Sequence, residues 1–172
     1  VVVPLTPRLD YDTVKDFGPV GSIYRFELVL VAHPSTPGHT LTEFISLAKA
    51  NPGRFTYATA DNGGLTHLAS AAFSLAAGIK MQQVPYKGSG PALTDLLGGQ
   101  VHIYFSSPGA ALPHVAAGKL KALAWTGSTR SPVYPNVPTM AESGVTLDAS
   151  SWGGLFVPAG TPADIVSKIS AD

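Results

Sequence analysis

The feature that most constrains the fold is an alternation of short apolar runs with segments in which apolar residues recur at helical spacing. Most of the short runs are rich in β-branched and aromatic residues, which favours strands. Four runs are expected to be strands: residues 54–59, 81–84, 101–105 and 120–125. Three helical segments separate them: residues 65–76, 92–97 and 111–115. Strands that alternate with helices predict an α/β fold with a parallel sheet, covered on both faces through right-handed crossovers.

The N-terminal segment has a different composition. Residues 1–21 are rich in proline, aspartate and glycine, and we expect them to form a surface connection. Residues 22–32 are apolar and predict a buried strand, which two charged residues, Arg25 and Glu27, interrupt. Either residues 24–26 form a bend that faces a cleft, or the two charges lie on an exposed strand edge.

Two capping boxes mark helix starts outside the alternation. They are Thr40-Leu-Thr-Glu43 and Thr139-Met-Ala-Glu142. Residues 126–138, between the last strand and the second box, contain too much proline and glycine for a core element and indicate a crossing into other structure. Beyond the second box we expect a strand at residues 152–157 and a helix that begins at Thr161-Pro162.

The composition excludes several classes of partner and site. The chain has 11 Lys and Arg residues against 11 Asp and Glu, with no basic run, so it offers no electrostatic footprint for nucleic acid or a membrane surface. No apolar run approaches the ~20 residues that span a bilayer. The chain opens on Val1 without a charged leader, which indicates a processed or truncated piece. With no cysteine and no histidine pair at ligand spacing, we expect no disulfide, metal site or cofactor.

The strongest candidate for a ligand site is the strand-loop-helix segment of residues 54–69, whose loop reads Asp61-Asn62-Gly63-Gly64. In an open α/β sheet such a loop lies at the carboxyl end of its strand, where a helix N-terminus presents unpaired N–H groups and partial positive charge. A structural alternative is that Asp61 or Asn62 caps the helix and stabilises it by ~0.5–2 kcal/mol. His67, one turn into the helix, either bonds a ligand or fixes the loop from behind.

A second glycine-rich loop carries weaker signals. Lys87-Gly88-Ser89-Gly90 lacks both the Gly-x-Ser-x-Gly elbow and the Walker spacing, so we interpret it as a turn into a helix that starts at Pro91. A small α/β hydrolase would need Ser89 as nucleophile with His102 or His114 as its base. We expect no catalytic residue and keep the hydrolase as a less favoured alternative.

Residues 57–67, Tyr-Ala-Thr-Ala-Asp-Asn-Gly-Gly-Leu-Thr-His, resemble the Tyr-Ala-Ser-Ala-Gly-Asn-Gly-Thr-x-x-His signature of Bug-type periplasmic solute-binding receptors, which serve tripartite tricarboxylate transporters. Further segments resemble that family in the same order: residues 11–17, 50–53, 84–101, 112–119, 137–144 and 151–162. As a set they cover nearly the whole chain.

The resemblance implies a periplasmic-binding-protein fold of the Venus-flytrap kind, type II-like, which clamps a small organic acid, a carboxylate or amino acid, between two α/β lobes and performs no chemistry. Residues 33–128 would be the complete lobe two, with a parallel-rich sheet flanked by helices. Residues 1–32 and 129–172 would be remnants of lobe one and the hinge crossings, because the family's N-terminal part has no counterpart here. The resemblance also implies a periplasmic location, reached through an N-terminal signal absent from this chain, and membrane permease subunits as partners.

The ligand-binding residues that the resemblance implies lie in the loop after residues 54–59, at a neighbouring strand end, and near the hinge and cleft. They are Thr59, Ala60, Asp61, Asn62, Gly63, Gly64, Thr66, His67, Ser106, Ser107, Phe26 and Trp152.

Three positions depart from the family pattern. The family usually has Gly where this chain has Asp61, Thr or Ser where it has Gly64, and often Asp-Asn at residues 106–107. An acid beside a carboxylate site matters, since like charges ~4 Å apart repel by ~1 kcal/mol even in bulk water. Either Asp61 points away as a cap, or this receptor prefers a less anionic or amine-bearing ligand.

An alternative of another class is the effector-binding lobe of a transcription regulator, which shares the flytrap plan but needs a basic helix-turn-helix upstream. Residues 1–21 show none. The resemblance also bears on assembly. Remnants of lobe one would expose apolar strands and unpaired edges, so we expect a homodimer or higher oligomer through residues 1–32 and 129–172.

Overall fold

A computed structural model describes residues 10–147 and 149–171 of the protein. Contacts between Cα atoms divide the chain into two units, one of residues 27–150 and one of residues 1–26 with 151–172. Each unit has a sheet of its own.

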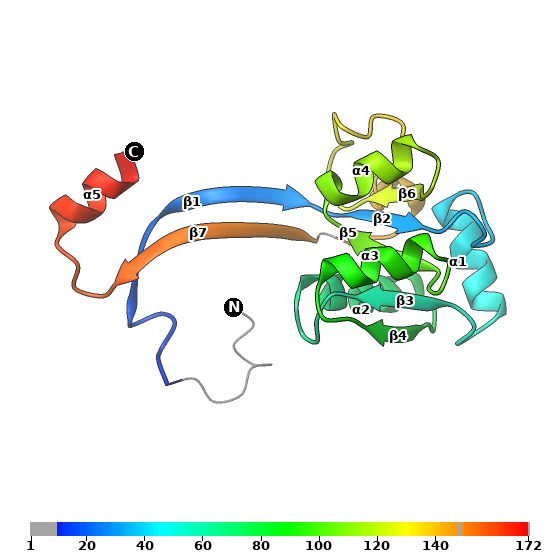
Figure 1. The fold of residues 1–172 in the computed structure, drawn as a ribbon, viewed down its shortest axis with the longest axis horizontal. Coiled ribbons are helices and arrows are strands. Elements are labelled where there is room, and N and C mark those ends of the chain that lie inside the picture. Colours follow the sequence, from blue (N-terminus) through cyan, green and yellow to red (C-terminus); the bar gives the residue numbers. More distant parts are fainter. Residues whose placement is uncertain (1–9, 148, 172) are drawn as a thin grey trace. The chain divides into compact units, whose positions relative to one another are not determined.

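The larger unit is built on a five-stranded sheet with the order β4-β3-β5-β2-β6 (Figure 1). Its strands are β2 (Val29–Ala32), β3 (Thr56–Thr59), β4 (Gln82–Pro85), β5 (Ile103–Ser106) and β6 (Lys121–Trp125). β3 runs parallel to β4 and β5, whereas β2 runs antiparallel to both β5 and β6. The sheet is therefore mixed. The alternation predicts the common direction of β3 to β6, but β2 precedes the first helix and enters from the opposite edge, with Val29 paired to Ser106.

Helices cover both faces of this sheet. They are α1 (Leu41–Ala50), α2 (Leu65–Ala77), α3 (Ser89–Leu97) and α4 (Pro108–Ala116). Ala92 of α3 and Ala111 of α4 share one buried cluster with Tyr104 of β5. Phe73 of α2 packs edge-on against Phe105 of β5, with ring centroids 5.9 Å apart. Because consecutive strand residues point to opposite faces, α3 and α4 cover one face and α2 covers the other.

The second predicted capping box is confirmed, whereas the first forms only its Thr40 bond, because the Glu43 carboxylate accepts from the His39 N–H (2.7 Å). The Thr40 hydroxyl accepts a hydrogen bond from the Glu43 N–H (3.2 Å) at the start of α1. Thr139 and Glu142 bond each other reciprocally, at 2.7 and 3.1 Å, before a short 3-10 helix (Ala141–Ser143). α3 begins at Ser89 and not at Pro91 as expected, since the backbone is already helical two residues before the proline.

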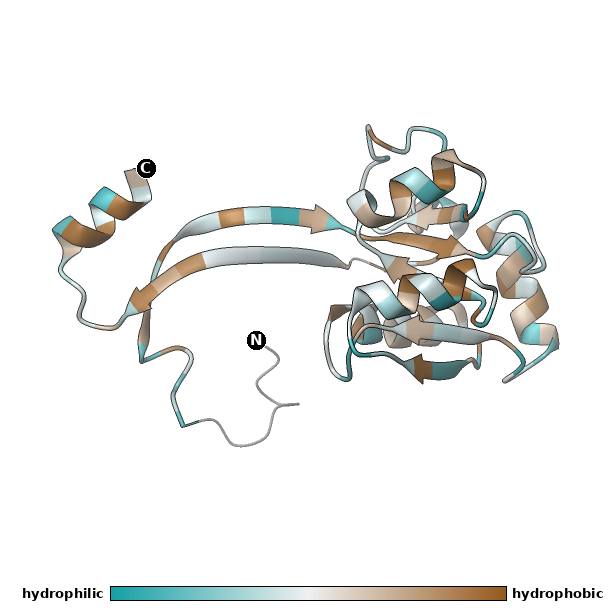
Figure 2. Cartoon of the chain, in the orientation of Figure 1, coloured by the Kyte–Doolittle hydropathy of each residue, from teal (hydrophilic) through white to brown (hydrophobic). Residues whose placement is uncertain are grey.

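The apolar stretch expected as one buried strand over residues 22–32 forms two strands. β1 (Phe17–Glu27) is largely exposed, whereas every residue of β2 is fully buried and hydrophobic (Figure 2). The strand breaks at Leu28, which exchanges hydrogen bonds with Thr126: the Leu28 N–H donates to Oγ1 (2.8 Å), and the Thr126 N–H donates to the Leu28 carbonyl (2.9 Å). Residues 24–26 lie within β1, so the interpretation as a bend is wrong.

The unit boundaries also differ from the expected lobe boundaries of residues 33–128. β2 lies between β5 and β6, so residues 29–32 belong to the larger unit. Residues 129–147 and Ala149 also belong to it, as the Met140 N–H donates to the Trp125 carbonyl and the Thr126 hydroxyl donates to the Ala149 carbonyl. Pairing between residues distant in sequence sets this boundary, and local composition carries little of that information.

The smaller unit contains β1, β7 (Ser150–Pro158) and α5 (Ala163–Ala171), and its sheet is the pair β1-β7. The two strands run in opposite directions, since Gly18 lies against Val157 and Gly21 lies against Gly154. The strand and helix expected at the C-terminal end are both confirmed. None of the described residues of α5 is buried.

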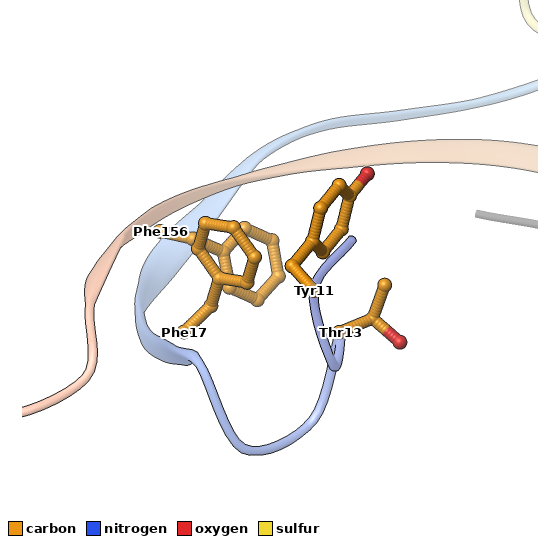
Figure 3. A pocket seen from close by; sticks show the side chains of 4 residues that line it. All are labelled: Tyr11, Thr13, Phe17 and Phe156. Carbon is orange, nitrogen blue, oxygen red and sulfur yellow. The ribbon is translucent and has the colours of Figure 1, made fainter. Parts of the chain in front are cut away.

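The surface of the smaller unit is rich in exposed apolar side chains. Ile23 is 67% exposed and Trp152 is 63% exposed. Tyr11, Thr13, Phe17 and Phe156 line a pocket of about 220 Å³ (Figure 3). In the part of the chain that the structure describes, no helix has both the length and the apolar character that crossing a bilayer requires.

Candidate functional site

The candidate site is the loop of residues 60–64, which joins β3 to α2 at the edge of the sheet where β3, β4 and β5 end. The loop folds back onto the first turn of α2. The Ala60 N–H donates to Oγ1 of Thr66 (2.9 Å), and the Gly63 N–H donates to Nδ1 of His67 (3.0 Å). Gly63 has a φ of 84°, a conformation that glycine adopts without strain. Of the two roles open to His67, the structure therefore shows the one that fixes the loop.

Neighbouring elements hold the same loop from the β4 side. Nε2 of Gln83, on β4, donates to Oγ1 of Thr59 (3.0 Å) and to Oδ1 of Asn62 (3.1 Å). The Tyr86 N–H donates to the Thr59 carbonyl (2.8 Å), and the Gly88 N–H donates to the Ala60 carbonyl (2.7 Å). The loop after β3 and the loop after β4 are thus joined.

The loop after β4 is itself fixed by a side chain. The Tyr86 hydroxyl donates to a carboxylate oxygen of Asp95 on α3, at 2.8 Å. Burial, followed by this hydrogen bond and the charge of Asp95, raises the pKa of Tyr86 to about 12. The phenol therefore stays protonated and keeps its bond at any physiological pH.

The backbone N–H groups in the first turn of α2 are not used by these hydrogen bonds. Among the described residues, none accepts a hydrogen bond from the N–H groups of Leu65, Thr66 or His67. Gly64 is the N-cap residue and has no side chain to cap them. Three unpaired donors and the partial positive charge of a helix N-terminus form an arrangement suited to an anion.

Asp61 lies beside these donors. Its carboxylate occupies the space where a side chain on Gly64 would begin. No described residue donates to that carboxylate, so the capping bond left open by the sequence is not formed. Burial raises the pKa of Tyr104 on β5, the Ser89 hydroxyl beside the phenol lowers it, and the negative charge of Asp61 raises it further. Asp61 thus lies close enough to Tyr104 to influence it.

The other predicted site residues lie outside the loop of residues 60–64. Ser106 ends β5 and is fully buried, and its hydroxyl donates to the Ser107 carbonyl (3.2 Å). Ser107 is the N-cap residue of α4 and makes no capping bond. Phe26 stacks on Tyr24 (ring centroids 5.7 Å apart), and Trp152 lies on β7, both in the smaller unit. The predicted residues of the larger unit follow neighbouring strands of its sheet, whereas Phe26 and Trp152 belong to the smaller unit.

Sequence reasoning missed two residues of the site, Gln83 and Tyr104. Gln83 lies opposite Tyr57 in the β3-β4 register and so points to the same face as Thr59. A pair of glutamines inside an otherwise apolar strand was the available signal for Gln83. Nothing local distinguishes Tyr104 from an ordinary core tyrosine.

The hydrolase pairing does not form. Nδ1 of His102 contacts Thr56, accepting from its N–H at 3.1 Å, at the edge of the sheet opposite Ser89. His114 lies in the last turn of α4, away from the edge at which α4 begins. Among residues 10–147 and 149–171, no group of three His, Cys, Asp or Glu side chains could hold a metal ion.

Fold and site together define a lobe of a solute-binding protein, and comparisons with known proteins identify its family. The family model for the tripartite tricarboxylate transporter family receptor, TctC, matches residues 1–172, and the chain belongs to this family. It is 39% identical over 167 residues to BugT of Bordetella pertussis, a match that covers 96% of this chain and 51% of BugT. The resemblance to Bug-type receptors is confirmed, and the family is one of solute-binding receptors and not of enzymes.

Solved structures agree on the fold. An adipate-bound protein from R. palustris is 36% identical with a TM-score of 0.85, covering 92% of this chain and 54% of that protein. MatC from Rhodopseudomonas palustris, with bound malate, is 34% identical with a TM-score of 0.86, covering 99% of this chain and 58% of MatC. The α/β periplasmic-binding-protein fold is confirmed. The chain spans about half the length of the curated relatives it matches, 51% in the case of BugT.

Proposed function

We propose that this chain is the ligand-binding part of a periplasmic receptor that captures a small carboxylate and delivers it to a tripartite tricarboxylate transporter. The observation that carries the proposal is the loop of residues 60–64, held rigidly against α2 while the first-turn N–H groups of Leu65, Thr66 and His67 have no acceptor among the described residues. A carboxylate is one of the anionic groups that bind the N–H donors of a helix N-terminus.

The relatives support this class of ligand. The R. palustris protein and MatC hold adipate and malate, both dicarboxylates. In this proposal Ala60, Asn62 and Gly63 form the wall of the ligand site, the fully buried Thr59 supports it from behind, and Ser107 lies at the neighbouring strand end. Phe26 and Trp152 stay candidate ligand-binding residues on the family resemblance alone.

The test is binding of malate and adipate, followed through the backbone amide NMR signals of Gly63 and Gly64 at millimolar ligand. We expect both signals to shift. His67→Ala removes the acceptor for the Gly63 N–H and should weaken binding about fivefold, since it releases a bond typically worth about 1 kcal/mol and lets the loop move. The matched control is His33→Ala, because His33 follows β2 at the opposite edge of the sheet. If neither ligand shifts these amides, the proposal is wrong.

The length of this chain should affect its affinity for the carboxylate ligand. Because its relatives are about twice as long, a second lobe would bury the far side of the ligand, and this chain by itself should bind weakly. Calorimetry on this chain and on a chimera that adds the N-terminal half of BugT should show tighter binding by the chimera. Equal affinities would show that the clamp model is wrong.

We also propose, from the exposed apolar surface of the smaller unit, that copies of this chain associate through β1, β7 and α5. This surface is smaller than residues 1–32 and 129–172, since residues 29–32, 129–147 and 149 belong to the larger unit of this structure. Exposed strand edges with apolar side chains recruit partners.

A further inference from the structure

Asp61 and Gly64 form a linked pair at the candidate site. Gly64 has φ −84° and ψ −175°, a backbone conformation that any residue can adopt. The backbone therefore does not require glycine. A Cβ atom on residue 64 would overlap the carboxylate of Asp61, so a side chain there requires that carboxylate to move.

The Asp61 carboxylate is a negative charge without a matching positive charge. Among the described residues, no nitrogen of Lys, Arg or His lies within the 4.0 Å that defines a salt bridge to it. Lys87 is the nearest cation along the joined loops and makes no such pair. The carboxylate lies at the position that a Cβ atom on Gly64 would occupy, beside the first turn of α2, and its charge also raises the pKa of Tyr104.

We propose that Asp61 selects a zwitterionic ligand, one with an ammonium group next to its carboxylate, such as an amino acid. This inference rests on the proposed function, because the ligand's carboxylate is taken to occupy the open N–H groups of α2. A ligand that binds there brings its neighbouring substituent close to Asp61. An ammonium group at that position forms an ion pair, whereas a second carboxylate meets a like charge.

The size of the preference follows from Coulomb's law. Unit charges ~4 Å apart in water interact with an energy that changes a binding constant about fivefold, in favour of the ammonium and against the carboxylate. The two effects multiply, and screening by salt at an exposed group reduces their product. We expect a preference on the order of tenfold for the zwitterion.

L-Aspartate and L-malate are matched probes, because they share a four-carbon dicarboxylate skeleton and differ in an ammonium against a hydroxyl group. Titrations at neutral pH would follow the amides of Gly63 and Gly64 in the 172-residue chain. Succinamate, a monoanion without an ammonium group, separates the effect of net charge from that of an ion pair. Both matched probes carry the second carboxylate, so only the ion pair separates them, and we expect L-aspartate to bind up to about fivefold more tightly than L-malate, with succinamate between them.

Two variants test the role of Asp61. Asp61→Asn keeps the shape and removes the charge, so it should abolish the preference for L-aspartate and improve binding of L-malate. Gly64→Ala should displace the carboxylate and reduce the same preference while the charge remains. Asp164→Asn on α5 is the control for a change in net charge and should leave the ratio unaltered.

The outcomes separate this inference from the function on which it rests. If L-malate binds as tightly as L-aspartate, or if Asp61→Asn leaves their ratio unchanged, selection by Asp61 is wrong while carboxylate binding stands. If none of the three ligands shifts the two amides, both proposals fail.

Discussion

Replacing Gln83 with alanine should loosen the loop of residues 60–64 without disturbing the sheet. Gln83 gives one amide group to two acceptors, Oγ1 of Thr59 and Oδ1 of Asn62. Asn62 is exposed, so water replaces its lost bond at little cost. Thr59 is fully buried, and a buried hydroxyl that loses its partner costs about 1–3 kcal/mol. The loss should therefore come mainly from Thr59.

Hydrogen exchange measures this effect at the loop itself. The Ala60 and Gly63 amides are bonded to Thr66 and His67, and they exchange only when the loop opens. A cost of about 1–3 kcal/mol should raise their exchange rates roughly 5-fold to 100-fold. Amides of the fully buried β2 should change little.

Gln82 is a matched control for Gln83. It is the preceding residue of the same strand, and its Nε2 donates instead to the Gly53 carbonyl, before β3 begins. Gln82→Ala should leave the exchange of Ala60 and Gly63 unchanged. Equal acceleration in both variants, or none in Gln83→Ala, would show that Gln83 does not hold the loop.

Two further predictions concern stability and assembly. Burial, and secondarily the charge of Arg54, lowers the pKa of His102 below its ordinary 6.5, so below that pH the unfolded chain takes up the proton more readily than the folded protein. The free energy of unfolding should therefore fall as the pH decreases from 6.5 toward the folded pKa, and denaturant titrations should show a flatter pH dependence in His102→Asn. Sedimentation at micromolar concentration should show a dimer or larger species, and Ile23→Asp with Trp152→Asp should shift it toward monomer; a wild-type monomer with a protease-resistant smaller unit would contradict association through β1 and β7.

Elements that depend on local chemistry could be predicted from the sequence. The capping bonds of Thr40 and Thr139 form within one helical turn, so nearby residues specify them fully. The strand-loop-helix order around residues 60–64 follows from an apolar run, a glycine pair and helical spacing. The family was also recognisable, because its segments are contiguous in sequence and occur in a fixed order.

Elements that depend on pairing across the chain could not be predicted. The split of residues 22–32 into an exposed β1 and a buried β2 depends on Leu28 meeting Thr126, almost a hundred residues later. The direction of β2 depends on its pairing with β5 and β6. The apolar composition of residues 29–32 fits a parallel or an antiparallel strand equally well. The larger unit spans residues 27–150 and not the expected residues 33–128 for the same reason, since its boundary depends on pairing across the chain.

The candidate site divides in the same way. The sequence by itself indicated which loop carries the candidate site, because a helix that starts after a strand end presents its N–H groups wherever it is placed. Only the tertiary structure decided that Gln83 holds this loop, that His67 is turned toward Gly63, and that the Asp61 carboxylate fills the space above Gly64. These relations depend on side-chain direction and on which strands are neighbours, and long-range packing sets both.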